Sequence, residues 1–91
     1  MIERIKNGTK PTEIFREIFS NNPELSNYEL ATMFRAKFSR ISMEAIQSIW
    51  YWKSGRGGQK GGGFNDDDLS KVLILCLQEA GYLPQDHLPP N

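Results

Sequence analysis

The chain has almost none of the residues that stabilise disulfide-linked or metal-dependent small domains. Its 91 residues include one cysteine, Cys76, and one histidine, His87. A single thiol cannot form an internal disulfide, and one cysteine and one distant histidine cannot form a Cys/His metal centre. The sequence therefore predicts a fold that depends on its hydrophobic core, without structural zinc or an oxidising compartment.

Long apolar runs are also missing. The longest run covers residues 72–77, whereas a membrane span needs about 20 residues. The first six residues carry charge and lack an apolar stretch of signal-peptide length. We therefore expect a cytoplasmic protein without a membrane span.

Recognisable catalytic and cofactor motifs are absent. The glycine-rich segment 55–63 fails the phosphate-loop pattern because Lys60 is followed by Gly61 rather than Ser or Thr, and it also fails the dinucleotide fingerprint. The acidic run 66–68 is better explained as first-turn charge that suits a helix dipole than as a metal site. The sequence predicts a non-enzymatic protein with no cofactor and no metal.

The formal net charge is zero, but the charges are unevenly distributed. Residues 35–64 contain six basic side chains and one acid, Glu44, and the remaining segments carry the compensating negative charge. This uneven distribution of charge indicates either a solvated basic face or a surface for a negatively charged partner.

Helix-start signals occur three times. Ser26 with Glu29 three residues later forms a capping box, Ser42 repeats the N-cap, and Asn65 caps the acidic turn. Gly55 and Gly81 offer helix stops. An earlier helix is predicted over residues 11–19, where Pro11 is tolerated in the first turn.

Apolar stripes at helical spacing predict which side of each helix is buried. Their members are Ile14, Phe15, Ile18 and Phe19; Leu30, Met33, Phe34 and Phe38; Ile46, Ile49 and Trp50; and Leu69, Val72, Leu73, Cys76 and Leu77. Because Ile74 and Leu75 widen the last stripe, we expect that helix near the centre of the core. The predicted fold is all-α: one compact domain of about four helices over residues 1–83, with an extended tail at residues 84–91.

The glycine-rich segment has two interpretations. It is a flexible linker before the last helix, or it is a mobile basic flap in which Arg56 and Lys60 meet phosphates. A short pair of strands beside it is possible.

Residues 26–54 resemble the helix-turn-helix of bacterial and phage DNA-binding proteins. The resemblance rests on Glu29-Leu30-Ala31 in the first helix and on the Ser42-capped second helix. It implies that residues 43–53 enter the major groove of duplex DNA, as in a phage or mobile-element transcription regulator.

The resemblance and the charge pattern together assign a nucleic-acid surface. Its candidate residues are Arg35, Lys37, Arg40, Gln47, Ser48, Tyr51, Trp52, Lys53, Arg56 and Lys60. Exposed aromatic and basic residues equally suit an acidic protein partner. A protein-interaction module or small inhibitor therefore remains the alternative.

Overall fold

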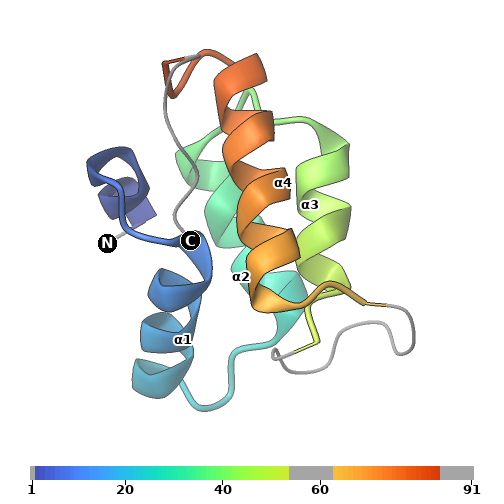
Figure 1. Ribbon diagram of the computed structural model, residues 1–91. Coiled ribbons are helices and arrows are strands. Elements are labelled where there is room, and N and C mark those ends of the chain that lie inside the picture. The colour runs from blue at the N-terminus through green and yellow to red at the C-terminus, as the bar shows by residue number, and fades with distance from the viewer. Residues whose placement is uncertain (1, 54–62, 85–91) are drawn as a thin grey trace.

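The computed structural model describes residues 2–53 and 63–84, and this part of the chain is helical throughout its regular elements (Figure 1). A 3-10 helix, η1 (Ile2–Asn7), precedes α1 (Pro11–Asn21), α2 (Asn27–Lys37), α3 (Met43–Trp50) and α4 (Asp66–Glu79). The described residues form no strand, only an isolated bridge between Trp52 and Phe64. The prediction of an all-α fold with four helices is confirmed.

Two of the three predicted caps form as expected. The Ser26 Oγ accepts a hydrogen bond from the Glu29 amide at 3.3 Å, and the Glu29 carboxylate accepts one from the Ser26 amide at 3.3 Å. The Asn65 side chain accepts a bond from the Asp68 amide at 2.8 Å. These contacts satisfy backbone donors that the first helical turn leaves without partners.

Ser42 stands at the N-cap position of α3 without a side-chain cap bond. Its hydroxyl lies instead 3.6 Å from the Cys76 Sγ of α4. The hydroxyl that was expected to cap α3 therefore contributes to the contact between two helices.

The helix ends follow the breakers in the sequence, with one exception. Helix α1 ends before Asn22 and Pro23, and α4 ends just before Gly81, which adopts a φ of 86°. Helix α3 ends at Trp50, so the prediction of a helix reaching residue 53 is wrong. The predicted stop at Gly55 lies outside the described residues.

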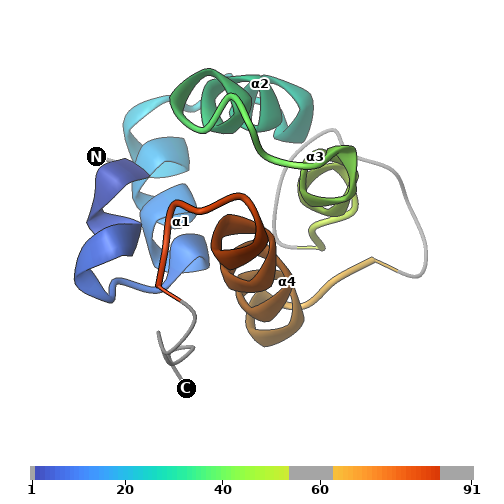
Figure 2. The ribbon, with the colours of Figure 1, turned by 90° about the horizontal axis from the view of Figure 1, so that it is seen from above.

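Helix α4 packs between α1 and α3. It contacts α1 on one side and α3 on the other, and α2 contacts α3 (Figure 2). The α4 side chains Leu69, Leu73 and Leu77 are fully buried, and they share the core with the Phe15 and Phe34 rings, whose centroids are 6.0 Å apart. The inner side of the last helix is thus part of the core, but its outer side, which includes Leu75, is exposed.

The buried stripes of α2 and α4 are narrower than predicted. Met33 is 40% exposed, Leu75 is 54% exposed, and Val72 is only half-buried. In α2 the small Ala31 and the polar Asn27 are buried instead of Met33. The inner side of this helix is therefore centred nearer to Ala31 than the apolar pattern suggests.

The N-terminal residues join the core through one side chain. Ile5 of η1 is fully buried, and η1 contacts both α1 and α2. The 3-10 turn therefore packs against both of these helices. None of the helices in the described part of the chain combines the length and apolar character that a bilayer span requires.

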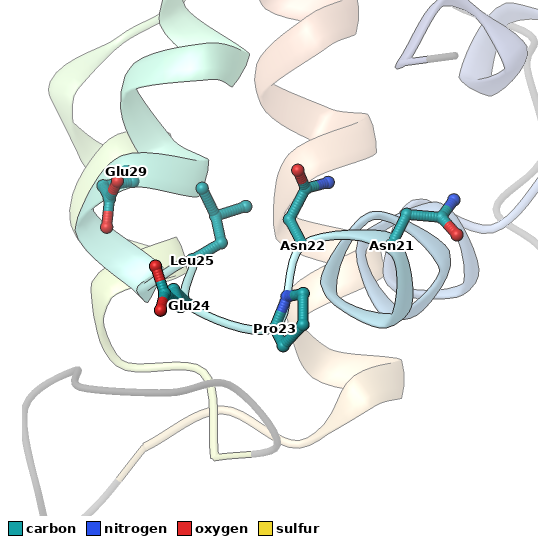
Figure 3. A pocket seen from close by; sticks show the side chains of 6 residues that line it. All are labelled: Asn21, Asn22, Pro23, Glu24, Leu25 and Glu29. Atoms are coloured by element: carbon teal, nitrogen blue, oxygen red, sulfur yellow. The ribbon is translucent and has the colours of Figure 1, made fainter.

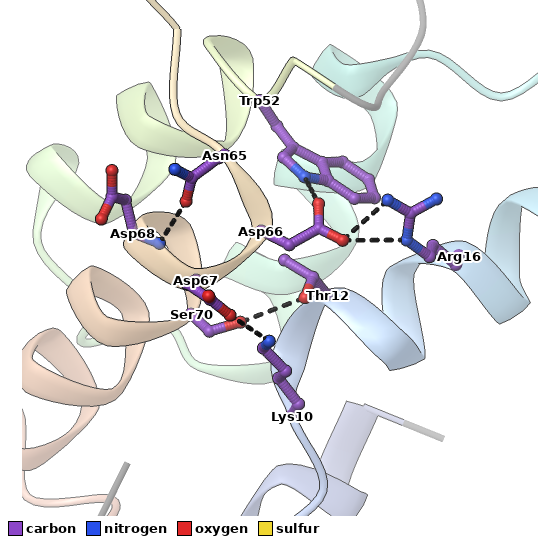
Figure 4. A network of polar contacts seen from close by, with 9 residues as sticks. All are labelled: Lys10, Thr12, Arg16, Trp52, Asn65, Asp66, Asp67, Asp68 and Ser70. Carbon is purple, nitrogen blue, oxygen red and sulfur yellow. Dashed lines mark hydrogen bonds and ion pairs between the residues drawn. The ribbon is translucent and has the colours of Figure 1, made fainter. Parts of the chain in front are cut away.

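Asp66, the first residue of α4, connects three elements (Figure 4). Its Oδ1 accepts a hydrogen bond from the Trp52 indole Nε1 at 2.9 Å, and its Oδ2 accepts bonds from Arg16 Nε and Nη2 at 3.1 and 2.7 Å. Next to it, Lys10 pairs with Asp67, and the buried Thr12 and Ser70 hydroxyls lie 3.1 Å apart. These contacts hold α1 against the N-terminal half of α4 and the residues after α3.

The turn between α2 and α3 is held by the residues that follow α4. The Arg40 backbone amide donates a hydrogen bond to the Tyr82 hydroxyl at 3.0 Å, and the Arg40 guanidinium lies 4.9 Å from the centroid of the same ring. The Tyr82 ring also contacts the Phe38 ring in an edge-to-face arrangement, with centroids 4.9 Å apart. The bond from the Arg40 amide lowers the pKa of Tyr82.

Candidate functional site

The outward side of α3 carries two of the predicted contact residues. Gln47 is exposed, and Tyr51 follows one turn later at the end of the helix. Met43, one turn before Gln47, is 47% exposed. The opposite side, Ala45, Ile46 and Ile49, is buried in the core. We refer to Met43, Gln47 and Tyr51 as the α3 row.

Ser48 does not belong to this surface. Its side chain is 4% exposed, and its hydroxyl donates a hydrogen bond of 2.7 Å to the Glu44 carbonyl oxygen one turn earlier. A serine can be buried at the edge of a helix because the preceding turn supplies an acceptor. Its predicted role as an outward contact residue is therefore wrong.

Trp52 is likewise buried, with 2% of its surface exposed. Because α3 ends at Trp50, the chain turns and directs the Trp52 ring against Phe15 and Phe19, each with its centroid 5.7 Å away. Its indole N–H donates a hydrogen bond to the Asp66 carboxylate. The prediction that Trp52 belongs to the contact surface is wrong, because its side chain is packed inside the core.

The described basic residues of the predicted surface are all exposed. Arg35 and Lys37 lie in the last turn of α2, Arg40 lies in the following turn, and Lys53 lies just after α3. Within the described residues, no ion pair or hydrogen bond engages the side chain of Arg35 or Lys53. Arg56 and Lys60 fall in residues 54–62, outside the described residues.

Three basic residues, one each in η1, in α1 and in the segment between them, have acidic partners. Arg4 pairs with Glu17 at 2.7 Å, Arg16 pairs with Asp66 at 2.7 Å, and Lys10 pairs with Asp67. The charges of these three side chains are therefore neutralised within the described residues. At Arg35 and Lys53 positive charge is available for an external anion.

Two residues that position the site were missed by sequence reasoning. The buried side chain of Asn27 donates hydrogen bonds to the carbonyl oxygens of Trp50 and Trp52 at 3.3 and 3.1 Å. The Tyr28 ring lies beside the Trp50 ring, with centroids 5.4 Å apart. Together they fasten the start of α2 to the end of α3, and a long-range contact of this kind leaves no local sequence signal.

Two pockets lined by described residues include no member of the α3 row. One of about 440 Å³ lies where α1 leads into α2, and its lining is Asn21, Asn22, Pro23, Glu24, Leu25 and Glu29 (Figure 3). A smaller one of about 210 Å³ is lined by Arg40, Ser42, Cys76, Glu79 and Ala80. Only Arg40 among the predicted contact residues borders either pocket.

The thiol at the smaller pocket is poorly suited to nucleophilic chemistry. Cys76 is buried, and this burial raises the pKa of its thiol. The reactive form of cysteine is the thiolate, which a raised pKa disfavours. Cys76 therefore behaves as a small apolar side chain of α4.

The acidic run at the start of α4 has protein partners. Asp66 accepts hydrogen bonds from Arg16 and Trp52, and Asp67 pairs with Lys10. The hydrogen bond from Lys10 is the main cause that lowers the pKa of Asp67. Among residues 2–53 and 63–84, no group of three or more His, Cys, Asp or Glu side chains is placed to hold a metal ion. These carboxylates thus serve helix packing.

No protein-family model, curated protein or solved structure matches this chain. The geometry of the site therefore carries the functional argument.

Proposed function

We propose that this chain binds duplex DNA through α3, as the helix-turn-helix resemblance implies. The observation that supports the proposal is the exposed α3 row together with the exposed Arg35 and Lys53, which have no acidic partner among the described residues. Gln47 lies in the middle of the row. Base edges need an uncharged hydrogen-bonding side chain, whereas phosphates need cations.

The dimensions of α3 suit this role. An α-helix with its side chains is about 10–12 Å in diameter, and the major groove of B-form DNA, which is about 12 Å wide, admits one. Asn27 and the Tyr28–Trp50 contact hold the end of α3 in place from one side. A helix held in this way can present Gln47 without ordering a mobile segment first.

The surrounding cations supply affinity without sequence preference. Arg35, Lys37, Arg40 and Lys53 are exposed around the helix pair, and Arg56 and Lys60 add two further charges in the sequence. Each phosphate that a cation neutralises steepens the salt dependence of binding by about 0.9 in a double-logarithmic plot.

A protein partner is the second candidate function. It is favoured by the exposure of four large apolar or aromatic side chains. Tyr28 and Met33 lie on α2, Met43 lies on α3, and Tyr51 directly follows α3. Aromatic and methionine side chains are enriched in protein interfaces. An acidic protein surface would meet the same cations as DNA.

Fluorescence anisotropy with labelled duplex DNA at several salt concentrations tests the proposal. The double variant Arg35→Glu/Lys53→Glu should weaken binding at low salt and reduce the salt slope by about 2, because two phosphate contacts are lost. Lys71→Glu, an exposed change on α4, is the control and should retain the slope.

Absence of binding to duplex DNA at low salt would contradict the proposal. Equal weakening by Lys71→Glu would show that overall charge rather than this surface governs binding. A salt-sensitive complex with an acidic protein, in the absence of DNA binding, would support the second candidate.

A further inference from the structure

The outward side of α3 contains no arginine or lysine. Its exposed side chains are Met43, Glu44 and Gln47, with Tyr51 at its end. The cations lie at the rim, on the last turn of α2 and at Lys53. The part of the surface that would reach deepest into a groove is thus uncharged apart from one carboxylate.

This composition limits which base pairs α3 can read. Guanine presents two acceptors, O6 and N7, and the side chains that commonly recognise it are Arg and Lys. Adenine presents an acceptor and a donor, which a glutamine amide matches with two hydrogen bonds. Thymine presents a methyl group, which apolar side chains contact.

The α3 row carries an amide that suits adenine and apolar groups that suit the thymine methyl, one after another along the helix. Gln47 stands in the middle, with the Met43 thioether one turn before it and the Tyr51 ring one turn after it. Successive turns of a helix are about 5.4 Å apart. An amide and its apolar neighbours can therefore lie over adjacent or next-adjacent base pairs, which are about 3.4 Å apart.

We infer that the α3 row selects A·T base pairs, with Gln47 on an adenine edge and Met43 and Tyr51 against thymine methyl groups. This inference rests on the proposed DNA-binding function. Specificity then comes from the uncharged centre of the surface, and affinity comes from its basic rim.

Three duplexes of equal length and charge test this inference. They share their flanks and differ in the centre, which is all A·T, all G·C, or the A·T block with uracil in place of thymine. The A·T duplex should bind most tightly at physiological salt. Uracil substitution should weaken binding by about fourfold for each methyl contact, since a buried methylene is worth about 0.8 kcal/mol.

Two variants locate the effect. Gln47→Ala should weaken binding to the A·T duplex by about tenfold or more, with little change for the G·C duplex. Met43→Ala should remove much of the difference between the thymine and uracil duplexes. Thr32→Ala, an exposed change on α2, is the control and should alter none of these ratios.

Circular dichroism of each variant checks that the fold is retained. Equal affinity for the A·T and G·C duplexes, or for thymine and uracil duplexes, would overturn the inference while leaving DNA binding intact. Failure to bind any duplex would overturn the proposed function and the inference with it.

Discussion

At the scale of single residues, the Asp66 side chain links the start of α4 to α1 and to Trp52 after α3. One carboxylate accepts hydrogen bonds from a buried indole and from Arg16. Asp66→Ala would leave the Trp52 N–H buried without that acceptor, and a buried group that loses its partner costs about 1–3 kcal/mol. Urea denaturation should show this loss in the free energy of unfolding.

Asp68→Ala is the matched control, because Asp68 lies in the same helical turn with an exposed side chain. It should cost clearly less than Asp66→Ala. In a Trp52→Phe background, where the indole donor is gone, Asp66→Ala should also cost less. An unchanged cost in that background would show that the Asp66–Trp52 bond contributes nothing to stability.

Residues that sequence reasoning misplaced share a physical cause. Ser48 and Trp52 are polar or amphipathic side chains whose donors are satisfied inside the fold, by the Glu44 carbonyl and by Asp66. Periodicity ranks residues by polarity and cannot show that a partner 14 positions away will neutralise that polarity. Gln47 and Tyr51, which lie on the outer side of α3, were placed correctly by the same periodicity.

At the scale of secondary-structure elements, the connection from α3 to α4 depends on one close backbone approach. The Phe64 amide donates to the Tyr51 carbonyl oxygen at 2.9 Å, and the Lys53 amide donates to the Phe64 carbonyl oxygen at 3.0 Å. A Cβ at Gly63 would lie 2.1 Å from the Tyr51 oxygen. Only glycine therefore allows the two segments to meet at this distance.

Gly63→Ala should separate these two hydrogen-bonded segments and destabilise the protein by about 1–3 kcal/mol, as overpacking commonly does. Amide hydrogen exchange should show faster exchange at Lys53 and Phe64. Gly81→Ala is the control, because its positive φ of 86° makes alanine unfavourable at a different place. If both variants left Lys53 and Phe64 equally protected, the close approach would not govern this connection.

Helix positions were the most predictable feature of the fold because local signals determine them. The capping box at Ser26 and Glu29, the Asn65 cap and the Gly81 stop act within one helical turn. The early end of α3 was not predictable, since it accompanies the distant contacts of Trp52 with α1 and α4. In the same way, the exposed side of α3 could be predicted from the local pattern, whereas the packing of Trp52, Asn27 and Tyr28 that supports it could not.

At the scale of the whole molecule, the Lys10–Asp67 pair ties the start of α1 to α4 and makes stability depend on pH. The hydrogen bond from Lys10 lowers the pKa of Asp67 below its ordinary value. The folded state therefore favours the ionised carboxylate. This contribution is present above the ordinary pKa and is lost as the pH falls through the lowered one.

Thermal unfolding from neutral to acidic pH should show this linkage. Lys10→Met should lower the melting temperature at neutral pH by a small amount, as expected for an exposed ion pair. The difference from the wild type should shrink as Asp67 becomes protonated. Lys53→Met, which removes a cation without an acidic partner among the described residues, should show no such convergence.

A pH-independent difference between Lys10→Met and the wild type would contradict this assignment. It would show that Lys10 acts through the packing of its aliphatic stem, because long charged side chains also cover apolar surface.

The bridge between Trp52 and Phe64 also affects how this protein can diverge. The Tyr51 carbonyl oxygen and the Lys53 amide are both hydrogen-bonded to Phe64, so the distance between the end of α3 and the start of α4 is set at this point. Sequence changes that preserve these two bonds therefore need not move α3 relative to α4, whereas changes at Gly63 that separate the two segments should do so.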